Sequence, residues 1–254
     1  KIKINLARGA IDLALNNGQK ALEILGISLV ESPPQALNIE KLARLGVMKE
    51  PNKLMAMKIF SLIYAPACFA ESSIALPILY TEITLSQQYG NSPPVVYAYA
   101  VYGIIVSWLM LDIDLAYQLG QLSLRVLEKL NAKDFWSKAY VSISINITYK
   151  KHHIKQTLEP LKKSIQKALE VGDLEFACHG ANFYCDHLLF VGNNLEFVHN
   201  QQKQYIDFIA QYQQEHPLNL IKICAQFVEI LVNESVVKNL TGTMLDEEKS
   251  LTHL

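Results

Sequence analysis

A spacing of 41 residues recurs along this chain of 254 residues and constrains its fold more than any other feature. Residues that favour the end of a helix recur at this interval, at Gly90, Asn131 and Gly172. Small residues recur at the same interval, at Ala98, Ala139 and Gly180, and so do the larger Tyr102, Ile143 and Tyr184. A fixed period of about 20 to 50 residues is the signature of stacked repeats. The sequence therefore predicts an array of similar structural repeats.

Each repeat is long enough to contain two helices. Segments of about 15 residues carry apolar side chains at three-to-four spacing, which indicates amphipathic helices, whereas alternating runs that would predict strands are few. The first helices of the repeats are predicted at about 93–111, 134–150 and 173–191, and the second helices at about 113–130, 156–171 and 195–214. An earlier pair is predicted at about 53–69 and 73–89, with remnants of another in 3–25 and the start of a further repeat at 217–232.

The recurring small residues fit positions where two helices cross. Packed helix axes lie about 8–10 Å apart, and the smallest side chains occur at the crossing point. A repeat of this size cannot cover its own apolar faces, so it needs neighbours on both sides. Asp112 or Asp114, and Thr157, are predicted to cap second helices. We therefore predict an all-α fold, a right-handed α-solenoid of antiparallel helix pairs that is TPR-like, with a repeat of about 41 residues.

The repeats extend along the whole chain, which predicts a single helical-repeat domain over residues 1–254. The chain begins at Lys1 without a methionine and has no export signal. We expect a fragment of a larger multidomain protein, with repeats that continue past the C-terminus. Except for Cys178 and Cys185, which are seven residues apart, the four cysteines lie far apart in sequence, and metal-binding pairs of the C-x-x-C type are absent. This favours free buried thiols in a reducing compartment and hence a cytoplasmic location.

Composition and charge argue against several classes of protein. With 50 % hydrophobic and 19 % charged residues, the chain is too apolar to be a disordered tail. A formal net charge of −1 lacks the basic excess typical of nucleic-acid binding, so no nucleic-acid partner is expected. The uncharged run 95–111 has the minimum length of a membrane span, but tyrosines interrupt it and no Lys or Arg flanks it. A buried helix is the favoured interpretation, and no membrane insertion is expected.

No catalytic residue, cofactor site or metal site is predicted. The chain contains no Walker A motif, dinucleotide-binding glycine pattern, zinc-protease motif or kinase catalytic loop. The side chains of Cys178, His179, Cys185 and His187 are of types that bind zinc. On a helix, however, the two cysteines share the packing face while the histidines turn away from it. Thiols buried in the core are therefore the favoured interpretation.

Two surfaces are candidate binding sites. A possible interaction face is formed by exposed positions of the first helices, namely Tyr97, Tyr99, Asn146, Tyr149, Asn182 and Asp186. Packing or plain solvent exposure is the alternative interpretation of these residues. A possible basic ridge follows in one loop and comprises Lys150, Lys151, His152, His153 and Lys155. This ridge could contact an acidic partner, a nucleotide phosphate or another domain, or be an ordinary solvated edge.

Several short strings, in one order along the chain, resemble a known family. They are residues 21–29, 89–93, 98–103, 127–133, 172–177, 240–242 and 247–249. Together they resemble the helical-repeat segment of the large multi-sensor signal-transduction kinases common in filamentous cyanobacteria. In that family a serine/threonine kinase is followed by a STAND-type ATPase, the helical repeats, a GAF domain and a histidine-kinase module. The resemblance brings no catalytic residue to this chain, because the kinase and nucleotide motifs of the family lie outside this segment.

The resemblance implies a non-catalytic regulatory and protein-interaction segment that links the ATPase and sensor or kinase modules of a parent protein kinase. Its expected partners are neighbouring domains or other signalling proteins. A homodimer is also expected if apolar faces normally covered by neighbours pair with each other. The alternative is a small-molecule effector sensor, like the repeat domains of STAND-type ATP-dependent transcription activators. A metabolite that raises the melting temperature would favour this alternative.

Overall fold

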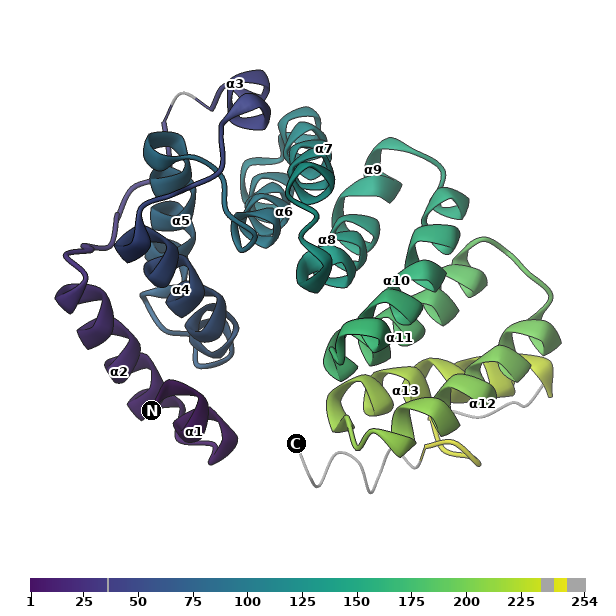
Figure 1. Ribbon diagram of the computed structural model, residues 1–254. Helices are drawn as coiled ribbons and strands as arrows, with labels where there is room; N and C mark the ends of the chain where they lie inside the picture. Colours follow the sequence, from purple (N-terminus) through teal and green to yellow (C-terminus); the bar gives the residue numbers. More distant parts are fainter. Residues whose placement is uncertain (36, 234–239, 246–254) are drawn as a thin grey trace. The chain divides into compact units, whose positions relative to one another are not determined.

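The computed structural model describes residues 1–35, 37–233 and 240–245. This described part consists of helices joined by short turns and contains no β-strand (Figure 1). One isolated parallel bridge pairs Val47 with Asn91. The chain divides into two compact units, Lys1–Phe135 and Trp136–Leu254, which we call the first and the second unit. The all-α prediction is therefore confirmed. Residues 247–249, which carry part of the family resemblance, lie outside the described residues.

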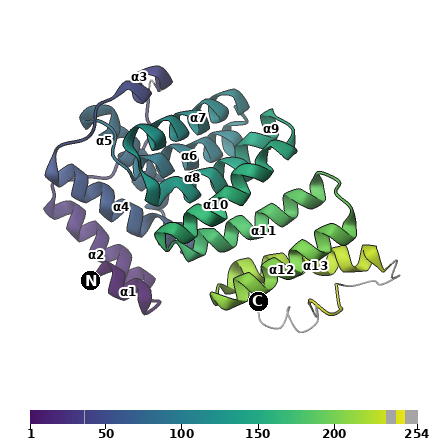
Figure 2. The same ribbon diagram turned by 45° about the vertical axis from the view of Figure 1, so that its right-hand side comes forward.

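The first unit contains the predicted helices and one that the prediction lacks. Its elements are α1 (Ile2–Ala7), α2 (Ile11–Ile24), α3 (Ile39–Arg44), α4 (Pro51–Phe69), α5 (Ala75–Tyr89), α6 (Val95–Ile105), the π-helical turn η1 (Val106–Met110), α7 (Ile113–Leu130) and the 3₁₀ turn η2 (Lys133–Phe135). Helix α4 packs against α2 and α5, and α6 packs against α7 (Figures 1 and 2). The short helix α3 is the element absent from the prediction.

The second unit begins where a new repeat is predicted to begin. Its elements are α8 (Trp136–Ile143), the π-helical turn η3 (Ser144–Thr148), α9 (Tyr149–Lys151), the 3₁₀ turn η4 (Ile154–Thr157), α10 (Leu158–Val171), α11 (Leu174–Phe190), α12 (Leu195–Gln211) and α13 (Glu215–Val232). Helix α10 packs against α8 and α11, and α12 packs against α11 and α13 (Figure 2). The predicted helix spans agree with these bounds to within a few residues.

The 41-residue spacing is present in the backbone as a series of positive φ angles. Gly90, Asn131 and Gly172 follow α5, α7 and α10 with φ of 99°, 48° and 74°. Asn131 and Gly172 adopt the left-handed conformation that commonly ends helices, and Gly90, with ψ of 170°, lies in an extended positive-φ region that is almost confined to glycine. The series continues to Gln213, 41 residues after Gly172, where φ is 54°. The period is therefore a property of the turns that end the second helix of each pair.

A close approach of two helices is seen at one of the three predicted small-residue positions, Gly180. Ala98 and Ala139 are buried in α6 and α8. At Gly180 in α11, an added Cβ would lie 2.8 Å from Ser164 Oγ of α10. Since real Cβ atoms do not approach other atoms so closely, the glycine is what allows α11 and α10 to pack at this distance.

The uncharged run 95–111 is a buried helix for most of its length. Tyr99 is fully buried, as are the smaller side chains around it in α6. The prediction is wrong for the last four residues, because Trp108, Leu109, Met110 and Leu111 are exposed. There the helix widens into the turn η1, and Leu111, with φ of 56°, leads the chain out toward α7. Among the described residues, no helix is both long enough and apolar enough to span a membrane.

The predicted helix caps are confirmed at one position and wrong at the other. Asp112 Oδ1 accepts a hydrogen bond from the Leu115 amide at 2.9 Å, as expected for the start of α7. Thr157 does not cap α10, because its hydroxyl donates to the Ile154 carbonyl and contacts the ring of His187. Its side chain therefore links the turn η4 to α11.

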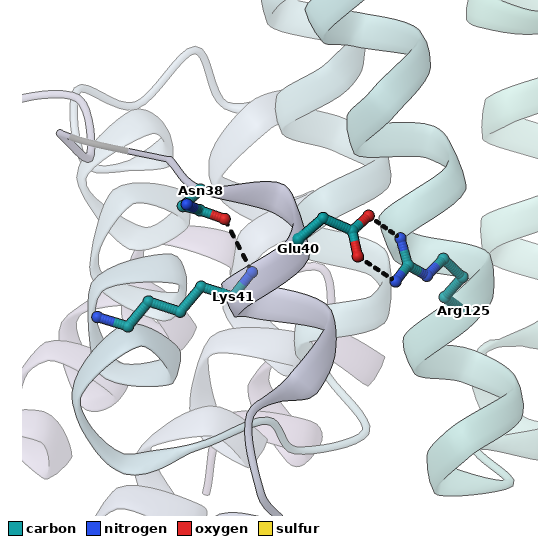
Figure 3. Close-up of polar contacts among 4 residues, drawn as sticks. All are labelled: Asn38, Glu40, Lys41 and Arg125. Carbon is teal, nitrogen blue, oxygen red and sulfur yellow. Dashed lines mark hydrogen bonds and ion pairs between the residues drawn. The ribbon is translucent and has the colours of Figure 1, made fainter.

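Helix α3 is attached to α7 by polar contacts within the first unit. Figure 3 shows the Glu40 carboxylate facing the Arg125 guanidinium, with two N–O distances of 2.7 and 3.0 Å. Asn38 Oδ1 caps the helix by accepting from the Lys41 amide at 2.9 Å. Lys129 donates to the carbonyls of Ala43 and Leu45, where α3 ends. The arginine lowers the pKa of Glu40, chiefly through the hydrogen bond between them.

Candidate functional site

A cavity of about 420 Å³ in the second unit contains three of the predicted interaction residues. It is lined by Ile145, Asn146, Tyr149, Ile154, Phe183, Asp186, His187 and Phe190. Asn146, Tyr149 and Asp186 belong to the predicted interaction face, and Asn182, also predicted, hydrogen-bonds to Asp186. The structure thus brings four of the six predicted residues together. Their role in binding stays a prediction.

The two walls of this cavity have different local structures. On α11 the lining residues lie at three-to-four spacing, so they share one helix face. That spacing around Asp186 is the signal that could have identified Phe183, His187 and Phe190, which the sequence prediction missed. The opposite wall comes from η3, α9 and η4, where the π-helical turn changes the phase of the helix. Turns of this kind are frequent at functional sites.

Asp186 is the charged residue in the wall of the cavity. Its Oδ2 receives a long hydrogen bond of 3.4 Å from Asn182 Nδ2, and the Cys224 thiol also hydrogen-bonds to the carboxylate. Its Oδ1 is buried and has no hydrogen-bond partner within the described ranges, and the same is true of Asn182 Oδ1. No basic side chain of the described residues forms an ion pair with Asp186. Burial raises the pKa of Asp186 to about 6, although the hydrogen bond from Cys224 acts in the opposite direction.

His187 is neutral at physiological pH. Burial lowers its pKa to about 4. The Thr157 hydroxyl already donates to the Ile154 carbonyl, so the contact between Thr157 Oγ1 and His187 Nδ1 requires Nδ1 to donate. This assignment leaves Nε2 of His187 as a hydrogen-bond acceptor.

The remaining predicted face residues, Tyr97 and Tyr99, lie in the first unit. Tyr99 is fully buried and its hydroxyl donates to Asn91 Oδ1 at 2.9 Å. Tyr97 is half-buried and packs edge-on against Tyr64. The exposure expected of Tyr99 is wrong, and so is that of Asn182, which is 1 % exposed. Both lie on first helices that pack against neighbours on more than one side.

Four residues of the basic ridge lie between two residues of the cavity wall, Tyr149 and Ile154, and the fifth, Lys155, follows Ile154. Four of its residues are exposed and Lys150 is half-buried. The imidazole of His153 caps the turn η4 by accepting from the Lys155 amide at 3.1 Å. This arrangement does not test whether the ridge binds an acidic partner, so its binding role stays a prediction.

The cysteines agree with the prediction of buried thiols at two of four positions. Cys178 and Cys185 are buried in the core of the second unit. Cys68 is exposed and Cys224 is half-buried, so the prediction is wrong for these two. Burial raises the pKa of Cys178 to about 11 and that of Cys224 to about 12, which keeps both as thiols at neutral pH. Among residues that the structure describes, no three His, Cys, Asp or Glu side chains lie close enough to share a metal ion.

Comparisons with known proteins give one informative similarity. No family model matches the chain, and no solved structure matches it. A stretch of 155 residues, 60 % of the chain, is 27 % identical to the hybrid signal transduction histidine kinase G of Dictyostelium discoideum. That stretch corresponds to 4 % of the kinase. The chain is thus similar to a small part of a much longer protein.

Proposed function

We propose that the chain is a regulatory and protein-interaction segment of a large signal-transduction kinase. The observation that carries this proposal is the similarity to a hybrid signal transduction histidine kinase over 60 % of the chain. Paired helices with a recurring turn geometry support a repeat architecture of the TPR-like kind, in which helix faces bind neighbouring domains. In this proposal the segment is cytoplasmic, has no active site, and links the ATPase and the sensor or kinase modules of its parent.

A stripe of apolar side chains on α13 is the surface best suited to such a partner. Ile223, Phe227 and Leu231 recur every four residues and are 41 %, 46 % and 43 % exposed. Residues at this spacing share one face of a helix. In a helical array, a face of this kind packs against the next helix or the next domain. A second copy of the chain could occupy the same face, which would produce the expected homodimer.

Co-elution of the chain with the separately produced kinase and ATPase modules of its parent tests this proposal. We expect one module to bind, and Phe227→Ser to weaken binding at least tenfold. Phe69→Ser is the matched control, because Phe69 is 71 % exposed but lies outside the stripe. Sedimentation of the chain alone reports whether two copies pair through the stripe. Failure of every module to bind the wild-type chain, or equal effects of the two substitutions, would contradict the proposal.

Effector sensing is a second candidate function, and the cavity of the second unit favours it. A volume of about 420 Å³ is within the range of pockets that bind small molecules. Buried acceptor atoms without partners are unusual in proteins, and a ligand that supplies donors would complete their hydrogen bonding. A bound metabolite would stabilise the second unit and change the faces that it presents to its partners.

A further inference from the structure

We propose that the cavity of the second unit binds a small organic ammonium compound, in which a primary ammonium group is attached to a flat apolar body. The ammonium group would lie at Asp186, and the apolar body would lie against Tyr149, Phe183 and Phe190. This inference rests on the second of the two proposed functions and specifies the chemical class of its ligand. The interaction function of the segment does not depend on it.

The unpaired polar atoms of Asp186, in the cavity wall, and of its hydrogen-bond partner Asn182 determine the kind of group that fits there. Asp186 Oδ1 and Asn182 Oδ1 are buried without partners, and both are acceptors. His187 Nε2 adds a third acceptor, because Nδ1 donates to Thr157. A group that completes these contacts must therefore donate hydrogen bonds. A primary ammonium carries three donors and no acceptor, and its charge compensates the carboxylate.

Burial of Asp186 strengthens the preference for a cation. An ionised carboxylate removed from water is costly unless an opposite charge accompanies it, and no basic side chain of the described part pairs with this one. The nearby ridge is basic, but its side chains are mostly exposed, where water and salt screen their charge. The partly buried carboxylate is therefore the stronger determinant of the charge of the ligand.

The other lining side chains determine the shape of the ligand. Tyr149, Phe183 and Phe190 provide aromatic surfaces, and Ile145 and Ile154 add aliphatic ones. Phe190 is 69 % exposed, so a flat apolar group placed against it would remove a large apolar surface from water. Aromatic rings also attract an ammonium group through their π electrons. Both parts of the proposed ligand are thus matched by neighbouring side chains.

Three probes of one shape and different charge test the inference on the purified chain. They are 2-phenylethylammonium, the neutral 2-phenylethanol and the anionic 3-phenylpropionate, each titrated at pH 7.5 by calorimetry and by ligand-observed NMR. We expect the ammonium probe to bind at least tenfold more tightly than the alcohol, and the anion not to bind. Equal affinity for ammonium and alcohol would overturn the inference, as would preference for the anion or failure of all three to bind.

Variants locate the site and separate its failure from loss of folding. Asp186→Asn keeps the shape of the side chain and should abolish the preference for ammonium over alcohol. Asp207→Asn, at an exposed aspartate on α12, is the matched control and should leave both affinities unchanged. Phe190→Ala, also at an exposed position, should weaken both probes about equally. If Asp186→Asn and Asp207→Asn behave alike, the site is not at Asp186. A negative result in every arm leaves the co-elution of the chain with kinase modules as a separate test of the interaction function.

Discussion

Substitution of Gly90 by alanine tests whether the turn after α5 requires a glycine. Gly90 has φ of 99° and ψ of 170°, a combination that is almost confined to glycine. An added Cβ would lie 2.5 Å from the Gly46 carbonyl oxygen, which accepts the hydrogen bond of the Asn91 amide. The Asn91 carbonyl in turn accepts from the Met48 amide at 2.8 Å. The substitution would therefore disturb the contact between the segment after α3 and the end of α5.

The expected effect of Gly90→Ala follows from two contributions. A residue forced into this backbone region costs about 1–3 kcal/mol, and overpacking against a neighbouring backbone costs about 1–3 kcal/mol more. We expect the free energy of unfolding of the first unit to fall by about 2–6 kcal/mol. Gly26→Ala is the matched control, because Gly26 has φ of 68° and its added Cβ would meet no atom within 4 Å. Only the left-handed penalty of about 1–2 kcal/mol applies there.

Urea denaturation followed by tryptophan fluorescence measures both variants. Trp108 lies in the first unit and Trp136 in the second, so a Trp136→Phe background makes the signal report on the first unit alone. The midpoint should shift further for Gly90→Ala than for Gly26→Ala, with an unchanged slope. Equal stability of the two alanine variants would refute the idea that the close approach at Gly46 constrains this turn.

Three further substitutions probe buried contacts. Glu82 is buried, which raises its pKa well above 4.5, so the native state keeps a proton that the unfolded state loses above that pH. Relative to Glu82→Gln, the wild type should therefore lose stability as the pH rises from 5 to 7, by at most about 1.4 kcal/mol per pH unit, in urea denaturation of both proteins at the two pH values. Gly180→Ala should be destabilising, because the added Cβ would lie 2.8 Å from Ser164 Oγ. In a Ser164→Ala background the loss of stability should be smaller, and a double-mutant cycle should give a coupling energy of about 1–3 kcal/mol. Tyr99→Phe removes the donor to the buried Asn91 side chain and should lower the free energy of unfolding by about 1–3 kcal/mol; a thermal midpoint equal to that of wild type would contradict this.

The helices and most of their ends could be predicted because they depend on local chemistry. Glycine and asparagine favour positive φ, so Gly90, Asn131 and Gly172 indicate helix ends directly. Gln213 occupies the next position of the series, but glutamine has no such preference and gives no signal. Leu111 also adopts a positive φ that its side chain does not favour. At these two positions the side chain gives no local signal of the turn, so the sequence pattern does not record it.

The candidate site could be predicted only in part, because its geometry depends on a local change of helix type. Asn146 and Asp186 are recognisable as polar positions on first helices. Their proximity depends on the turn η3, where the wider π-helical geometry shifts the following side chains relative to a regular helix. The burial of Tyr99 agrees with the buried-helix interpretation of 95–111, because α6 is apolar on all sides and such a helix is covered by protein.

The position of the cavity follows from an interruption of the helix that begins with α8. A regular helix can pack along its whole length against a neighbour, which leaves no space between them. In the second unit, η3 widens the first helix, and α9, the loop and η4 then turn the chain before α10 begins. The end of α11 faces this irregular segment, and the space between them is lined by aromatic and polar side chains. Deletion of one residue within 144–148 should restore a regular helix and therefore close the cavity. This variant should no longer bind 2-phenylethylammonium, while its helical content, measured by circular dichroism, should equal that of the wild type. Undiminished binding by that deletion variant would show that the interruption does not create the site.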